Sequence, residues 1–297
     1  MSMRNSSRSL LAQVTRPAAK GAPLFAATPS AARSLIIPSR PALNQPPQDK
    51  KQGLFNSLLR GSESAQADGL TTQSHSATVA RGKYIHEIQR HDVKADRVEE
   101  YKQVLAEYYP KIFGDEQYKA RLKGSWEVTV GELETFYHIW EYDGYAGYDA
   151  SDAALANSTL LNEFTAAIRP TLRHRSNWIC QEFAFWPTAK AKNDGGIYEL
   201  RTYHLQPGKL LEWEQHWRKG LEARRRYTEP VGAWFTQIGG LHTVFHVWHY
   251  PSLEKRKETR DAAWQVETWN HTVSETVKLI DKMHAQIMKP LPFSPLR

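Results

Sequence analysis

Residues 124–142 read GSWEVTVGELETFYHIWEY, and a closely related stretch occurs 108 residues later. The second copy, residues 232–250, reads GAWFTQIGGLHTVFHVWHY, and eight of the nineteen positions are identical. Each copy has two β-like runs joined by a glycine-containing turn, which is the pattern of a β-hairpin. The chain therefore contains an internal duplication with a hairpin at the centre of each copy.

The segments on either side of the hairpins also correspond. Residues 85–88 (IHEI) parallel residues 197–200 (IYEL) as a first strand, and apolar residues at helical spacing follow in both copies. Beyond the second hairpin, a long helical stretch is predicted after Pro251, with apolar positions from 262 to 280 at helical spacing. The closing strands are predicted over 177–186 and 287–293, and the prolines in the second suit a sheet edge.

The order strand, helix, hairpin, helix, strand is the βαββαβ ferredoxin-like motif. A sheet with helices on one face must bury its other face as well, and two such sheets placed face to face form a dimeric α/β-barrel. We therefore predict an α+β fold in which two tandem units make a pseudo-dimer. The expected divisions are a leader and linker over 1–50, a short amphipathic segment and flexible linker over 51–82, and repeated domains over 83–189 and 190–297.

The basic character of the chain comes from its beginning. The net charge is +7, but residues 1–60 hold nine basic residues and one acidic residue, so the rest has a net charge of −1. The folded part thus lacks an overall positive field, and we expect no nucleic-acid binding. No apolar run approaches the ~20 residues that cross a bilayer, so we expect no transmembrane segment.

The first acidic residue is Asp49, and the residues before it are rich in Arg, Ser and Ala. This composition is typical of a mitochondrial transit peptide. Together with the missing transmembrane segment, it predicts a location in the mitochondrial matrix. A disordered basic tail on a cytosolic protein is the alternative.

A short apolar pattern follows the leader. Leu54, Phe55, Leu58 and Leu59 have helical spacing and predict a small amphipathic helix. It either docks on the protein itself or serves as a partner-docking or peripheral membrane segment.

Several segments resemble the NIPSNAP family over nearly the whole chain after the leader. They are residues 196–208 (GIYELRTYHLQPG), 231–239 (VGAWFTQIG), 258–264 (ETRDAAW) and 287–296 (IMKPLPFSPL). The resemblance implies a mitochondrial protein with a dimeric α/β-barrel domain, linked to mitophagy signalling. It also implies protein partners, including autophagy-related ones, and no settled catalytic activity. Homo-oligomerisation is a further expectation.

Strand alternation places His138 with Trp140 on one face and His246 with Trp248 on the corresponding face. The first strand of each unit should lie beside the second hairpin strand, which brings Glu87 near His138 and Glu199 near His246. We therefore predict two Glu/His pairs inside the barrel, flanked by tryptophans. The candidate ligand site comprises Glu87, Trp126, His138, Glu199, Arg201, Trp234 and His246.

Such a pair fits three interpretations. It can be a structural polar network, a site for haem or a small aromatic ligand, or a general acid/base pair. We expect no metal site, because His246 and His249 would face opposite sides of a strand. No cofactor is expected. The leading interpretation is a non-enzymatic interaction or signalling protein, and the alternative is a barrel enzyme or ligand-binding protein of the monooxygenase-like type.

Overall fold

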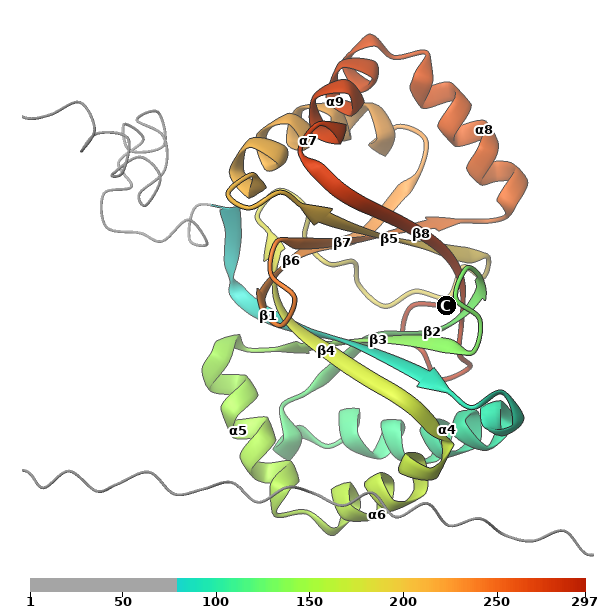
Figure 1. The fold of residues 1–297 in the computed structure, drawn as a ribbon. Helices are drawn as coiled ribbons and strands as arrows, with labels where there is room; N and C mark the ends of the chain where they lie inside the picture. The colour runs from blue at the N-terminus through green and yellow to red at the C-terminus, as the bar shows by residue number, and fades with distance from the viewer. Residues whose placement is uncertain (1–78) are drawn as a thin grey trace, which may run out of the picture. The chain divides into compact units, whose positions relative to one another are not determined.

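The computed structural model describes residues 79–297 (Figure 1). The predicted leader and linker and the predicted helix over residues 54–59 lie outside the described residues. None of the helices in residues 79–297 has the length and apolar character needed to span a membrane.

Two units with the same order of elements follow one another. The first unit contains β1 (Ala80–Val93), α4 (Val98–Phe113), β2 (Arg121–Val130), β3 (Thr135–Tyr142), α5 (Gly144–Ala156), α6 (Thr159–Ile168) and β4 (Leu172–Phe183). The second unit contains β5 (Ile197–Leu205), α7 (Leu210–Arg225), β6 (Glu229–Ile238), β7 (Thr243–Tyr250), α8 (Leu253–Trp264), α9 (Glu267–Val277) and β8 (Ile280–Pro290). Both units have the βαββαβ order that the duplication predicts, and in both the second helix is divided into two.

Two local predictions for the end of the chain were wrong. The long helix expected after Pro251 is two helices, because Val266 takes an extended conformation between α8 and α9. The last strand begins at Ile280, earlier than expected, because residues 281–285 are all exposed and show no alternation. It is also not an edge strand, since β8 pairs with both β5 and β2.

The eight strands close into a barrel in the order β1-β3-β2-β8-β5-β7-β6-β4. Within each unit the sheet order is that of a ferredoxin-like fold, and the units join through the antiparallel pairs β2–β8 and β4–β6. Figure 1 shows α4, α5 and α6 outside one half of the barrel and α7, α8 and α9 outside the other. The predicted α+β barrel is confirmed.

Each sheet therefore separates two cores. The barrel interior is filled by side chains that include Trp126, Tyr198, Trp234, Phe245 and Met288, all at most 1% exposed. A separate core lies between each sheet and its own helices, with α4 and α6 over the first unit and α7 over the second. Any cavity in the fold must be sought in these three layers.

The repeated Gly-x-Trp motif has a packing role. In the barrel interior, the Trp126 ring lies where a side chain on Gly124 would extend, with a built Cβ only 1.8 Å from the ring. Trp234 covers Gly232 in the same way, at 2.3 Å. Both glycines sit at irregularities in strand register. The motif thus fits two large indoles into the barrel.

Candidate functional site

The predicted site residues fall on two different faces of the sheets. Trp126 and Trp234 lie inside the barrel, as expected. His138 and His246 instead lie beneath the helices, where Tyr101 of α4 and Trp217 of α7 contact them. Glu87, Glu199 and Arg201 share this helix-facing side. Placing the Glu/His pairs in the barrel interior was therefore wrong.

Strand register explains the error. Trp126 is paired with Tyr137, the residue before His138, and Trp234 is paired with Phe245, the residue before His246. Each tryptophan therefore lies on the opposite face of the sheet from the histidine of its unit. The histidine is paired with Ser125 in one unit and with Ala233 in the other. A displacement of one residue in register exchanges the two faces of a strand.

In the first unit, Glu87 and His138 are not in contact. Glu87 accepts hydrogen bonds from Tyr142 Oη at 3.0 Å and Asn177 Nδ2 at 2.6 Å. His138 Nδ1 is 2.6 Å from Ser125 Oγ, and its Nε2 is 2.8 Å from Tyr101 Oη. The serine and the histidine have no exposed surface. Burial lowers the pKa of His138 well below its ordinary value, so this polar chain is a neutral internal network.

The second unit holds Glu199 between two guanidinium groups. Arg256 donates two hydrogen bonds to the carboxylate, at 2.6 and 2.9 Å, and Arg201 donates one at 2.9 Å. The carboxylate is completely buried. Burial alone would raise its pKa, but the Arg256 hydrogen bond and the charges of the two arginines outweigh burial and lower the pKa. Glu199 is an ion-pair centre rather than a base for His246.

Two further arginines lie nearby without a carboxylate partner. Arg224 is 3% exposed, donates to Tyr250 Oη at 2.6 Å, and leaves its buried Nε–H without a partner. Arg260 has no ion pair or hydrogen bond within residues 79–297. Burial lowers the pKa of both guanidinium groups. Four guanidinium groups therefore surround a single carboxylate.

Three of these groups, those of Arg201, Arg224 and Arg260, border a cavity of about 140 Å³ between the second sheet and α7, α8 and α9. His246 also lines it. Because Trp248 Nε1 donates to His246 Nδ1 at 2.8 Å, the proton of the neutral ring is on Nε2, which is buried and has no partner. Burial, followed by the charges of Arg201 and Arg224, lowers the pKa of His246. This cavity, the second-unit pocket, thus has a positively charged lining.

Our sequence prediction missed three of the four arginines. Arg224, Arg256 and Arg260 lie on helices, far in sequence from the hairpin that dominated the repeat. A signal existed within the repeat itself, because the corresponding residues of the first unit are Ile112, Tyr148 and Asp152. The second unit thus has arginine at three positions where the first unit has an uncharged or acidic residue. This difference between the repeats indicates that the helix side of the second unit has a chemistry of its own.

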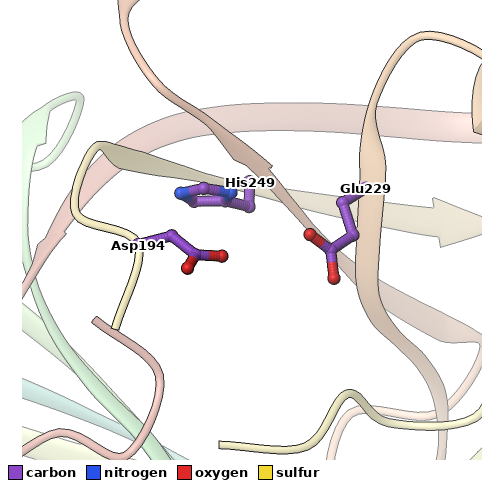
Figure 2. A group of neighbouring side chains, drawn as sticks. All are labelled: Asp194, Glu229 and His249. Atoms are coloured by element: carbon purple, nitrogen blue, oxygen red, sulfur yellow. The ribbon is translucent and has the colours of Figure 1, made fainter. Parts of the chain in front are cut away.

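A second polar cluster lies at the connector between the units. The ligand atoms of Asp194, Glu229 and His249 all lie within 4.8 Å of one another (Figure 2). Lys192 Nζ forms an ion pair with Glu229, lies 3.3 Å from Asp194, and is 3.5 Å from His249 Nδ1. The ammonium group thus already supplies the positive charge that a metal ion would bring. The cluster fastens the connector to β6 and β7.

The fold and these pockets define a protein of the dimeric α/β-barrel class. The NIPSNAP family model matches residues 86–187 and 198–295, one match for each unit, and the chain belongs to the NIPSNAP family. Protein NipSnap homolog 1 of Danio rerio is 38% identical over 216 residues, which cover 72% of this chain and 77% of the relative. Human protein NipSnap homolog 2 is 37% identical over 217 residues, with 72% and 75% covered.

The fold extends beyond the family. The crystal structure of an anthrone oxidase-like protein superposes with a TM-score of 0.53 and 12% sequence identity, over 73% of this chain and 95% of that one. At this identity the likeness concerns the fold alone.

Proposed function

We propose that this protein is a mitochondrial binding protein that takes up a small organic anion in the second-unit pocket and acts through partners rather than by catalysis. The single observation behind this proposal is the excess of buried and partly buried guanidinium groups around Glu199. Unpaired buried charge is unfavourable, and an anion in the cavity relieves it. The aromatic rings of Trp217, Trp248 and Trp269 supply an apolar wall for the rest of the ligand.

The absence of a contact between Glu199 and His246 supports binding over acid/base catalysis. A general base needs a partner that orients it and tunes its pKa, whereas His246 is neutral and bonded only to Trp248 among the described residues. The guanidinium groups of Arg201, Arg224 and Arg260 in the lining are of the kind that binds a carboxylate or phosphate.

The proposal also covers the cellular setting. The basic leader and family membership support action in the mitochondrial matrix, with protein partners in mitochondrial quality control, autophagy-related ones among them. Leu54, Phe55, Leu58 and Leu59 are the proposed docking residues, and homo-oligomerisation is part of the proposal. Loss of partner capture by a Leu54→Asp/Leu58→Asp variant tests the docking segment.

The anion site is tested by calorimetric titration of the full chain with benzoate, inorganic phosphate and benzyl alcohol. We expect an anion to bind, benzyl alcohol to bind at least tenfold more weakly than benzoate, and an Arg224→Gln/Arg260→Gln variant to lose at least tenfold in anion affinity. Arg218→Gln, an exposed change on α7, is the control and should bind normally. Binding of neither anion, or equal anion binding by the double variant, would refute the proposal.

A further inference from the structure

A second and larger cavity lies beneath the helices of the first unit. It measures about 400 Å³ and is bounded by the sheet strands β1, β3 and β4 and by α4, α5 and α6. This first-unit pocket occupies the same layer of the fold as the second-unit pocket. Its lining includes Glu87, Tyr109, Trp140, Tyr142, Tyr148 and Phe164.

The carboxylate of Glu87 is the distinctive polar group in this pocket. The residue is 6% exposed, and both oxygens accept hydrogen bonds from neutral groups, those of Tyr142 and Asn177. Within residues 79–297, no Lys, Arg or His nitrogen lies within ion-pair distance of it. A buried carboxylate that lacks a cation is unusual, because burial without a counter-charge costs free energy.

The second unit shows what is missing. Glu199 corresponds to Glu87, since each is paired with a tryptophan of the neighbouring strand, Trp248 or Trp140. Arg201 lies two residues after Glu199, and Gln89 lies two residues after Glu87. One unit therefore places a guanidinium beside its carboxylate where the other has a neutral amide.

The second arginine is missing in the same way. Arg256 is the sixth residue after Tyr250 at the end of β7, and Tyr148 is the sixth after Tyr142 at the end of β3. The duplication has kept the buried carboxylate in both units but has supplied its cations in only one. From this difference we propose that the first-unit pocket binds an organic ammonium ion, whose charge takes the place that Arg201 and Arg256 occupy in the second unit.

The walls of the pocket suit this ligand. Tyr109 packs edge-on against Trp140, with ring centroids 5.0 Å apart, and Tyr142 packs edge-on against Tyr148 at 5.1 Å. Cations are attracted to the faces of such rings, and the attraction is strongest in desolvated sites. The apolar part of an amine has the remaining aromatic and aliphatic lining to contact.

Two charged residues at the solvent side do not change this assignment. Arg175 lines the pocket but is exposed and forms no ion pair with Glu87. Asp152, which also lines the pocket and is exposed, offsets its charge. Because the charges of Arg175 and Asp152 offset each other, the Glu87 carboxylate gives the first-unit pocket a net negative charge. The second-unit pocket is positively charged instead.

The test is a titration of the full chain with benzylamine and with the neutral benzyl alcohol, which has nearly the same shape. We expect benzylamine to bind at least tenfold more tightly, and Glu87→Gln to remove that difference. In Tyr148→Arg, a guanidinium at the position of Arg256 should pair with Glu87, raise the thermal midpoint and abolish benzylamine binding. The rise in thermal midpoint shows that this variant is folded.

The Arg224→Gln/Arg260→Gln variant separates this proposal from the anion site. It should bind benzylamine like the unmodified protein while losing benzoate. Equal affinity for benzylamine and benzyl alcohol, no binding of benzylamine, or full benzylamine binding by Tyr148→Arg would each overturn the assignment of an ammonium site.

Discussion

Glu141, on the interior face of β3, shows how one residue depends on its neighbours. Its carboxylate lies 3.2 Å from His86 Nε2, 3.1 Å from Arg121 Nε and 3.5 Å from Lys123 Nζ. Burial works to raise its pKa, but the His86 hydrogen bond and the nearby positive charges outweigh burial and lower the pKa to about 2. The carboxylate is therefore much harder to protonate in the folded protein than in the unfolded chain.

This difference predicts acid sensitivity. A carboxylate whose pKa is lowered by folding stabilises the protein above its unfolded pKa of 4.5, and that contribution is lost as the pH falls from 4.5 toward 2. Glu141→Gln should lower the free energy of unfolding at pH 7 by roughly 3 kcal/mol and flatten its pH dependence in this window. Denaturant unfolding at several pH values measures both. Glu163→Gln, an exposed change on α6, should keep the original slope; an unchanged slope in Glu141→Gln would refute the prediction.

At the scale of elements, the outer wall of the second-unit pocket depends on the contact between α7 and α9. Gly220 of α7 faces Thr272 of α9 so closely that a built Cβ on the glycine would lie 2.5 Å from the threonine Cβ. The missing side chain allows the two helices to approach. That approach brings Trp217 and Arg224 of α7 to the same cavity as Trp269 of α9.

Gly220→Ala should therefore destabilise the protein. Alanine is favoured over glycine in a helix by about 1 kcal/mol, but overpacking at the helix contact costs about 1–3 kcal/mol and should prevail. Benzoate affinity should fall as well, because the wall of the pocket moves. Thermal unfolding and titration measure the two effects, and Lys219→Ala, an exposed neighbouring change, should be nearly neutral. A Gly220→Ala protein that is more stable than the original would contradict this account.

The sequence predicted elements better than it predicted site geometry. The repeated hairpin was sufficient for the βαββαβ order, because turns and apolar alternation are local signals. It was not sufficient for the faces, since the pairing register decides whether His138 lies opposite Ser125 or opposite Trp126. The arginine cluster depends on how the helices pack across the sheet. The local sequence pattern of a single helix or strand does not predict that packing. The predicted domain boundaries at 83, 189 and 190 stay predictions.

For the whole molecule, the barrel is closed only by strand pairing between the two units. Strand β4 pairs with β6, and β2 pairs with β8, so separating the units would expose unpaired edges on both. The barrel interior would open as well, because Trp126 of one unit packs with Tyr198 of the other, with ring centroids 5.4 Å apart.

Neither half should therefore form a stable monomer. Residues 79–189 produced alone should dimerise or aggregate, whereas co-production with residues 190–297 should restore a soluble one-to-one complex. Light scattering after size-exclusion chromatography distinguishes these states. A monomeric fragment with cooperative thermal unfolding would show that barrel closure is dispensable.

The covalent link between the halves has an evolutionary consequence. In a barrel assembled from two identical subunits, every substitution appears twice, so both sites must change together. Here the halves are encoded separately along one chain, and Arg256 was free to differ from Tyr148 while the buried glutamates were kept. After duplication and fusion, the two halves could therefore diverge in sequence. One molecule now has two unlike pockets, and selection can act on the chemistry of each pocket independently.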